Sequence, residues 1–144
     1  QGYRRGTENL PAAIGFAAAL EAGFAWMEDA VRLRKILEDA VVECGGIVVA
    51  SESNRLATIG SYRMPGVAAS SQLINFDMAG IAVSAGSACS SGTLKTSHVL
   101  GAMGWDGISA SEVIRVSFGA FTNDDDIARF IDVWRSIAAR AKAA

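Results

Sequence analysis

Ile81-Ala82-Val83-Ser84 is a short apolar run that opens into Ala85-Gly86-Ser87-Ala88-Cys89-Ser90-Ser91-Gly92-Thr93, a stretch made almost entirely of small residues. That stretch is too rich in glycine and serine for an element interior, so we predict a strand over 81–84 followed by a loop. Cys89 is therefore expected to be accessible, and its thiolate would be a nucleophile. The composition alone is equally compatible with a buried cysteine that packs as a small hydrophobic residue.

Upstream of this loop, the apolar spacing between Glu8 and Cys44 predicts two helices or one long bent helix, with Pro11 in the first turn and Gly45-Gly46 after the end. Short runs at 46–50 and 57–62 predict neighbouring strands, because both are rich in β-branched and apolar residues and a polar stretch separates them. Residues 67–79 predict a helix that ends at Gly80.

Downstream of the loop, residues 97–103 predict a short helix. In the run 113–118 the side chains alternate, so a strand there would place Arg115 on the polar face, opposite an apolar face. The last helix shows one apolar stripe, three aspartates at its positive end and Thr122 as the expected N-cap. This order of elements predicts a compact α+β domain with a short sheet packed against helices.

The composition narrows the classes of function. With 144 residues, 51% of them hydrophobic and 19% charged, the chain has enough apolar material for one domain with a sizeable core. A net charge of −2 offers no basic surface for nucleic acid, and no apolar run reaches the roughly 18–20 residues of a membrane helix. Two cysteines and one histidine make neither a disulfide framework nor a metal site, so we expect a cytoplasmic protein. Because the first residue is Gln1, we expect a piece of a longer protein.

Three patches of the chain together resemble one family. They are Arg4-Arg5-Gly6-Thr7-Glu8-Asn9, the small-residue loop with Ser97-His98-Val99-Leu100 after it, and Ile114-Arg115-Val116-Ser117-Phe118-Gly119. The chain resembles the C-terminal part of a cysteine desulfurase of the NifS/IscS type, a pyridoxal-phosphate enzyme of the class V aminotransferase group. The resemblance runs from Arg4 to the last helix, and it implies the small C-terminal domain of a fold-type I enzyme with a short stretch from the end of its large domain.

The resemblance also implies roles for three residues. Cys89 would take sulfur from L-cysteine, releasing L-alanine and leaving a persulfide for a sulfur-acceptor protein, and the loop over 86–97 would be its flexible tether. Arg115 would bind the substrate carboxylate, although a strand arginine without the motif would be read as exposed or ion-paired. Thr7 would contact the cofactor phosphate of the neighbouring subunit in a homodimer, and it can also cap the first helix.

Two departures from the family pattern qualify this assignment. The family's Schiff-base lysine has no counterpart, because Lys35, Lys95 and Lys142 all have ordinary polar surroundings in the sequence. This chain alone is therefore expected neither to hold pyridoxal phosphate covalently nor to turn over cysteine. The Arg-x-Gly-His-His-Cys pattern of the short-loop relatives is absent, which favours the long-loop subgroup and its iron–sulfur or tRNA-thiolation acceptors.

Three other functions stay open on the sequence alone. An aminotransferase-like protein would have the same fold and an incidental Cys89. A stand-alone binding or assembly module would need no cofactor lysine. A hydrolase that pairs Cys89 with His98 is the least favoured, because the sequence places no orienting residue or oxyanion site beside them, and we expect His98 to be structural or to anchor the loop.

Overall fold

The computed structural model describes residues 9–86 and 97–143. Its elements in chain order are α1 (Leu10–Glu21), α2 (Trp26–Glu43), β1 (Ile47–Val48), β2 (Ile59–Arg63), α3 (Ala69–Met78), β3 (Ser84–Ala85), α4 (His98–Ala102), α5 (Gly107–Ser111), β4 (Val113–Ser117) and α6 (Asp124–Ala143). The α+β class predicted from the order of elements is confirmed.

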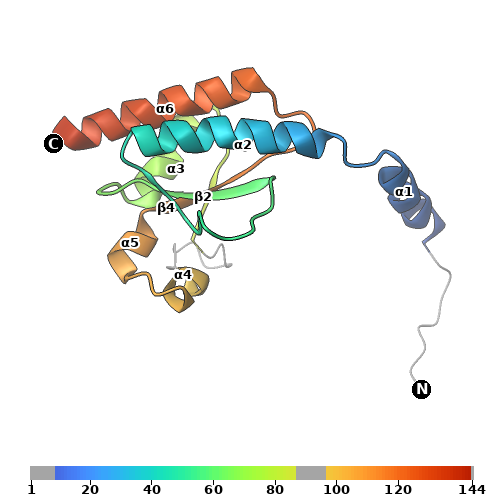
Figure 1. Cartoon of the computed structure of the whole chain (residues 1–144), viewed down its shortest axis with the longest axis horizontal. Coiled ribbons are helices and arrows are strands. Elements are labelled where there is room, and N and C mark those ends of the chain that lie inside the picture. Colours follow the sequence, from blue (N-terminus) through green and yellow to red (C-terminus); the bar gives the residue numbers. More distant parts are fainter. Residues whose placement is uncertain (1–8, 87–96, 144) are drawn as a thin grey trace.

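The four described strands form one antiparallel sheet in the order β1-β2-β4-β3. Ser61 of β2 lies opposite Arg115 of β4, and Ser84 of β3 lies opposite Arg115 on the other side. The long helices α2 and α6 run side by side over one face of this sheet, and α4 and α5 lie away from them (Figure 1). The sheet therefore has one face under the long helices and a second face that they leave uncovered.

The main core lies between the sheet and helices α2, α3 and α6. The whole apolar stripe of α6 is buried, as its spacing predicts, and it comprises Ile127, Phe130, Ile131, Trp134, Ile137 and Ala138. Strand β4 turns its alternate side chains Ile114 and Val116 into this core, and Phe118 beyond the strand is buried as well. Arg115 and Ser117 are exposed, so the predicted polar face of this strand is confirmed.

Most expected elements are present with small changes of boundary, and β3 differs more. The strand predicted over 81–84 is only Ser84–Ala85. Its ladder consists of the pairs Ser84 with Arg115 and Ala85 with Ile114, so the pairing with β4 begins only at Ser84. The preceding residues are held instead by the end of α3, where the Ile81 amide donates to the carbonyl of Phe76 at 2.9 Å.

The start of α6 corrects the predicted cap. Asn123, and not Thr122, caps this helix: its Oδ1 accepts from the Asp126 amide, and Asp126 Oδ2 accepts from the Asn123 amide, both at 3.1 Å. Thr122 lies one residue too early and accepts from the Gly119 amide instead. The reciprocal pair satisfies two orphan donors, which is the arrangement of a capping box. Helix α5 was not expected from the sequence at all.

We predict that Asn123→Ala lowers the free energy of unfolding by about 1 kcal/mol, because an N-cap side chain is lost. Urea unfolding followed by circular dichroism measures this change. Ser136→Ala, an exposed replacement within the same helix, is the control and should change the free energy by less than about 0.5 kcal/mol. Equal effects of the two substitutions would contradict the cap assignment.

Helix α1 differs from the other long helices because none of its side chains is buried. It projects from the body of the molecule (Figure 1), with Leu10, Ile14, Phe16 and Leu20 between 52% and 68% exposed. Asn9 caps it, and Pro11 occupies its first turn as predicted. In the described part of the chain no helix is by itself long and apolar enough to cross a membrane; α1 and α2 meet that criterion of length and composition only as a pair, bent by 69°.

Candidate functional site

A cavity of about 410 Å³ lies on the second face of the sheet. The alternation of each strand turns Ile59 and Ser61 of β2, and Val113 and Arg115 of β4, toward the same face, and all four line the cavity. Val99 and Leu100 of helix α4, with Met103 at its C-cap, form a second wall, and residues of the segment before β2, among them Arg55 and Leu56, form a third. The cavity therefore arises where the sheet is not covered by its long helices.

Both ends of the cysteine loop meet at this cavity. Gly86, which follows β3, and Ser97, which caps α4 by accepting from the Leu100 amide, are among its lining residues. Cys89 itself lies outside the described residues, as does Thr7. The structure thus brings Arg115 together with the two ends of the segment that carries the predicted nucleophile, although Arg115 and Cys89 are 26 positions apart in the chain.

Arg115 is held by its strand and leaves its guanidinium available. It sits at the middle of β4 with a strand on each side, and its side chain is exposed. Its guanidinium has no hydrogen-bond or ion-pair partner among residues 9–86 and 97–143, whereas the guanidinium of Arg63 on the neighbouring strand is paired with Glu112 at 2.7 Å. A guanidinium placed this way can receive a carboxylate through two parallel hydrogen bonds.

The backbone before Arg115 is anchored by a buried polar network that the sequence analysis did not identify. Glu112 accepts from Arg63 Nε at 2.7 Å and from the Gly66 amide at 2.9 Å. Gln72, fully buried on α3, donates to the carbonyls of Val67 and Glu112, both at 2.8 Å. These contacts fix the residue that precedes β4, and with it the register of the strand that carries Arg115.

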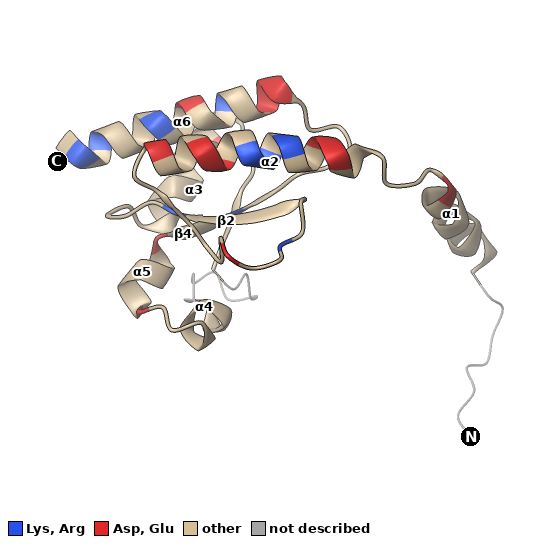
Figure 2. Ribbon diagram, in the orientation of Figure 1, with Lys and Arg blue, Asp and Glu red and all other residues tan. Residues whose placement is uncertain are grey.

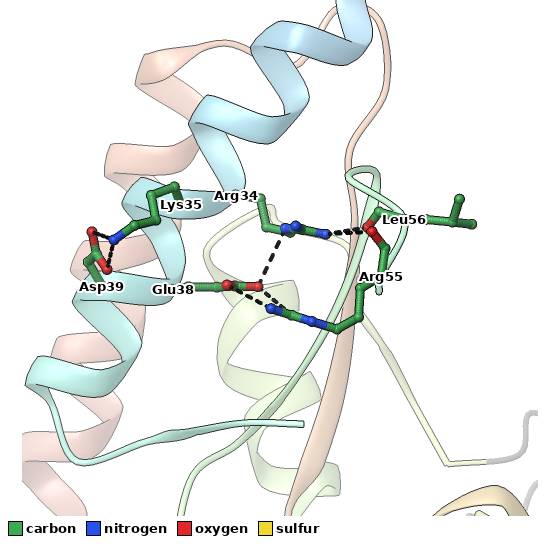
Figure 3. Close-up of polar contacts among 6 residues, drawn as sticks. All are labelled: Arg34, Lys35, Glu38, Asp39, Arg55 and Leu56. Carbon is green, nitrogen blue, oxygen red and sulfur yellow. Dashed lines mark hydrogen bonds and ion pairs between the residues drawn. The ribbon is translucent and has the colours of Figure 1, made fainter. Parts of the chain in front are cut away.

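The described cavity lining is mostly apolar and contains two arginines, Arg55 and Arg115, but no carboxylate. Charged residues gather on α2 and α6 on the other side of the sheet, whereas α4 has none (Figure 2). Arg55 is joined to Glu38 of α2 by two hydrogen bonds, which raise the pKa of its guanidinium (Figure 3). The cavity is therefore suited to an anion with an apolar part.

Two side chains outside the described lining of the cavity, those of Tyr62 and Asp106, have shifted pKa values. Burial raises the pKa of Tyr62, which lies in the core beside the same ion-pair cluster. Hydrogen bonds from Ser109 lower the pKa of Asp106, the N-cap of α5. Neither group is a described lining residue of the cavity, whose described charged side chains are those of Arg55 and Arg115.

Other candidate residues lie apart from the cavity. His98 is exposed at the first position of α4 and is not one of the described lining residues. Cys44 caps the C-terminus of α2 as a free, partly buried thiol packed against the main core, where its role is structural. The hydrolase pairing of His98 with Cys89 is not tested, because Cys89 is outside the described residues.

The described lysines do not fit a covalent bond to pyridoxal phosphate. A Schiff-base lysine needs a desolvated or cation-adjacent amine. Lys35 is 71% exposed and ion-paired with Asp39 at 2.5 Å, and Lys142 is exposed near the end of α6. Within residues 9–86 and 97–143, the chain therefore offers no amine suited to hold such a cofactor.

The sheet, its helices and the loop-bounded cavity define an α+β domain with an anion-attracting site. The chain belongs to the class-V aminotransferase family, whose defining pattern, "Aminotransferase class-V", matches residues 1–130. It is 34% identical over 151 aligned residues to a protein of Archaeoglobus fulgidus named "Cysteine desulfurase IscS 1", and 36% identical over 148 to "Cysteine desulfurase" of Gluconacetobacter diazotrophicus. Both alignments cover 99% of this chain.

A solved structure supports the same relationship. The crystal structure of a NifS-like protein from Rickettsia africae matches 94% of this chain with a TM-score of 0.77 and 29% identity. The chain spans only 39% and 37% of the length of the two curated relatives, and 36% of that solved structure. The resemblance read from the three sequence patches, to the C-terminal part of a NifS/IscS-type cysteine desulfurase, is confirmed at the level of family and fold.

Proposed function

We propose that residues 1–144 are the small C-terminal domain of a cysteine desulfurase, with a short stretch from the end of the larger domain. The observation that supports this most is the convergence of Arg115 and both ends of the cysteine loop, Gly86 and Ser97, on one cavity without described carboxylates. The exposed apolar surface of α1 supports the presence of a larger domain, because a helix that is apolar all round is normally buried.

In this proposal the reaction converts L-cysteine and the Cys89 thiol into L-alanine and a Cys89 persulfide. The Cys89 thiolate attacks the substrate sulfur, the new S–S bond forms as the substrate C–S bond breaks, and the electron pair left on carbon takes up a proton to give alanine. Pyridoxal phosphate, when bound by the complete enzyme, supplies the electron sink for such chemistry. The residues described here hold the substrate and do not anchor the cofactor.

Arg115 would bind the substrate carboxylate, and the apolar side chains of the cavity would exclude water from it. Removing water strengthens the attraction between guanidinium and carboxylate, because the effective dielectric constant falls. Thr7 would contact the cofactor phosphate of a neighbouring subunit, so the complete enzyme would act as a homodimer. The persulfide would pass to an acceptor protein of the iron–sulfur or tRNA-thiolation pathways, in the cytoplasm.

The decisive experiment uses the full-length enzyme with pyridoxal phosphate and L-cysteine in the absence of reductant. Peptide mass spectrometry is expected to find added sulfur on the Cys89 peptide only when both cysteine and cofactor are present. Cys89→Ser should release no alanine above background, because the nucleophile is lost.

Cys44→Ser is the matched control for that experiment. Cys44 belongs to the end of α2 and packs against the main core, so its replacement should leave both the persulfide and alanine release unchanged. A protein that binds the cofactor but leaves Cys89 unmodified would favour the aminotransferase-like function and would overturn the proposal.

A further inference from the structure

A cluster of three charged side chains joins helix α2 to the segment that leads into β2. Arg55 donates to both carboxylate oxygens of Glu38, at 2.6 and 3.1 Å. Arg34, one turn before Glu38, lies 3.6 Å from the same carboxylate through its Nε and donates through Nη1 to the carbonyl of Leu56 at 2.5 Å. The three side chains are only 15–17% exposed. We call this set the Arg34–Glu38–Arg55 clamp (Figure 3).

The clamp acts on an irregular segment that the core holds only at its two ends, where Val49 and Ala57 are buried. Residues 49–58 form neither helix nor strand, and their few backbone bonds include the Ser53 amide to the Ala50 carbonyl at 3.0 Å. This segment delivers Arg55 and Leu56 to the wall of the candidate cavity, and Ile59 at the start of β2 completes that wall. Leu56 is 65% exposed, so its own side chain is not packed into the core.

The clamp depends on the Glu38 carboxylate, because it is the one negative charge between two positive ones. Two guanidinium groups share one carboxylate, and all three groups are largely withdrawn from water. Removing one partner of such a buried set leaves uncompensated charge, which costs far more than the loss of an exposed pair. Without Glu38, the lowest free energy would be reached by moving Arg55 into solvent, and the cavity wall would move with it.

We infer that Glu38 is a positioning residue for the cavity: through Arg55 it fixes the part of the wall formed by Arg55 and Leu56, and so sets how tightly the cavity holds its ligand. Glu38 is not itself a described lining residue of the cavity. The inference rests on the proposed function for the identity of the ligand, L-cysteine, but the position of the wall can be measured independently of any activity.

The test compares Glu38→Gln with Asp39→Asn in the full-length enzyme. Asp39 is the next residue of α2, and its ion pair with Lys35 is exposed and separate from the clamp. Glu38→Gln is expected to raise the KM for L-cysteine roughly tenfold while kcat stays within about twofold, because binding is weakened equally in the ground and transition states. Asp39→Asn should leave both constants unchanged, since exposed pairs contribute little.

Hydrogen–deuterium exchange of peptides covering 49–59 is the second readout, and it does not depend on catalysis. Glu38→Gln should speed exchange there roughly fivefold or more, because the local opening of the segment becomes easier, whereas Asp39→Asn should not. Unchanged exchange in Glu38→Gln would overturn the inference even if the enzyme is a desulfurase. Faster exchange in an enzyme that lacks desulfurase activity would support the clamp and overturn the proposed function instead.

A milder variant covers the case in which Glu38→Gln does not fold. Arg34→Lys keeps the positive charge but cannot reach the carboxylate and the Leu56 carbonyl at once, because lysine lacks the planar fork of arginine. It should give a smaller increase in KM and in exchange over the same peptides. Wild-type values of both in this variant would count against the clamp.

Discussion

Replacing Arg115 by alanine in the proposed cysteine desulfurase is expected to lower kcat/KM for L-cysteine by roughly 10²–10³-fold, because the charge-assisted contact with the substrate carboxylate is lost. Arg115 supplies the only described guanidinium in the cavity that has no partner within residues 9–86 and 97–143; the other, Arg55, is bound to Glu38. Arg115→Lys keeps the charge but loses the two-pronged contact, so its activity should lie between those of the wild type and the alanine variant.

Steady-state alanine release with saturating cofactor measures the effect of both Arg115 substitutions. Ser117→Ala is the matched control, because Ser117 lies two residues along the same strand and face without being one of the described lining residues. Its activity should match the wild type. An Arg115→Ala enzyme that folds normally and keeps kcat/KM within about threefold of the wild type would rule out the carboxylate role, since that change is below 1 kcal/mol.

Trp134→Ala is expected to lower the free energy of unfolding by about 3–5 kcal/mol, a larger loss than that of Asn123→Ala. The substitution removes a large aromatic side chain from a close-packed core. Trp134 is 1% exposed. Its ring lies 6.1 Å from that of Phe130 and meets the edge of Tyr62 at 6.5 Å. Gly46 approaches the indole so closely that a Cβ there would lie 2.9 Å from it, so this neighbour has no side chain that could fill the space that alanine would leave.

Urea unfolding of the 144-residue chain, followed by circular dichroism, measures this loss. Phe121→Ala is the control, because Phe121 is also aromatic but is 96% exposed, and truncating it should change the free energy of unfolding by less than about 0.5 kcal/mol. A loss below about 1 kcal/mol for Trp134→Ala would mean that the core can collapse around the vacated volume.

The elements that the sequence predicted well are those with a long periodic signal. The stripe of α6 covers six buried residues over more than three turns, and the alternation of β4 identified Arg115 as outward-facing. Helix α5 was missed because five residues, Gly107–Ser111, are too short to show a helical period. Its one signal was Asp106, whose carboxylate accepts from the Ile108 and Ser109 amides as an N-cap does.

The site was only partly predictable for a different reason. Arg115 could be found from its strand, but Arg55 lies in an irregular segment and contacts a helix residue 17 positions earlier. No periodic pattern links two such positions, so the clamp depends on the folded arrangement of α2 and β2. A partial signal was present, because Arg34 and Glu38 are four residues apart on the same side of a helix.

The isolation of α1 has a consequence for where the cooperative folding unit begins. The first buried side chain of the described core is that of Ala30. The part of the chain that unfolds cooperatively therefore begins near the bend after α1 and not at Leu10. A helix of 12 residues is marginal in water without tertiary contacts. Its helicity is therefore coupled to the covering of its apolar surface, and amide protection along Leu10–Glu21 would report assembly with a partner surface rather than the stability of the domain.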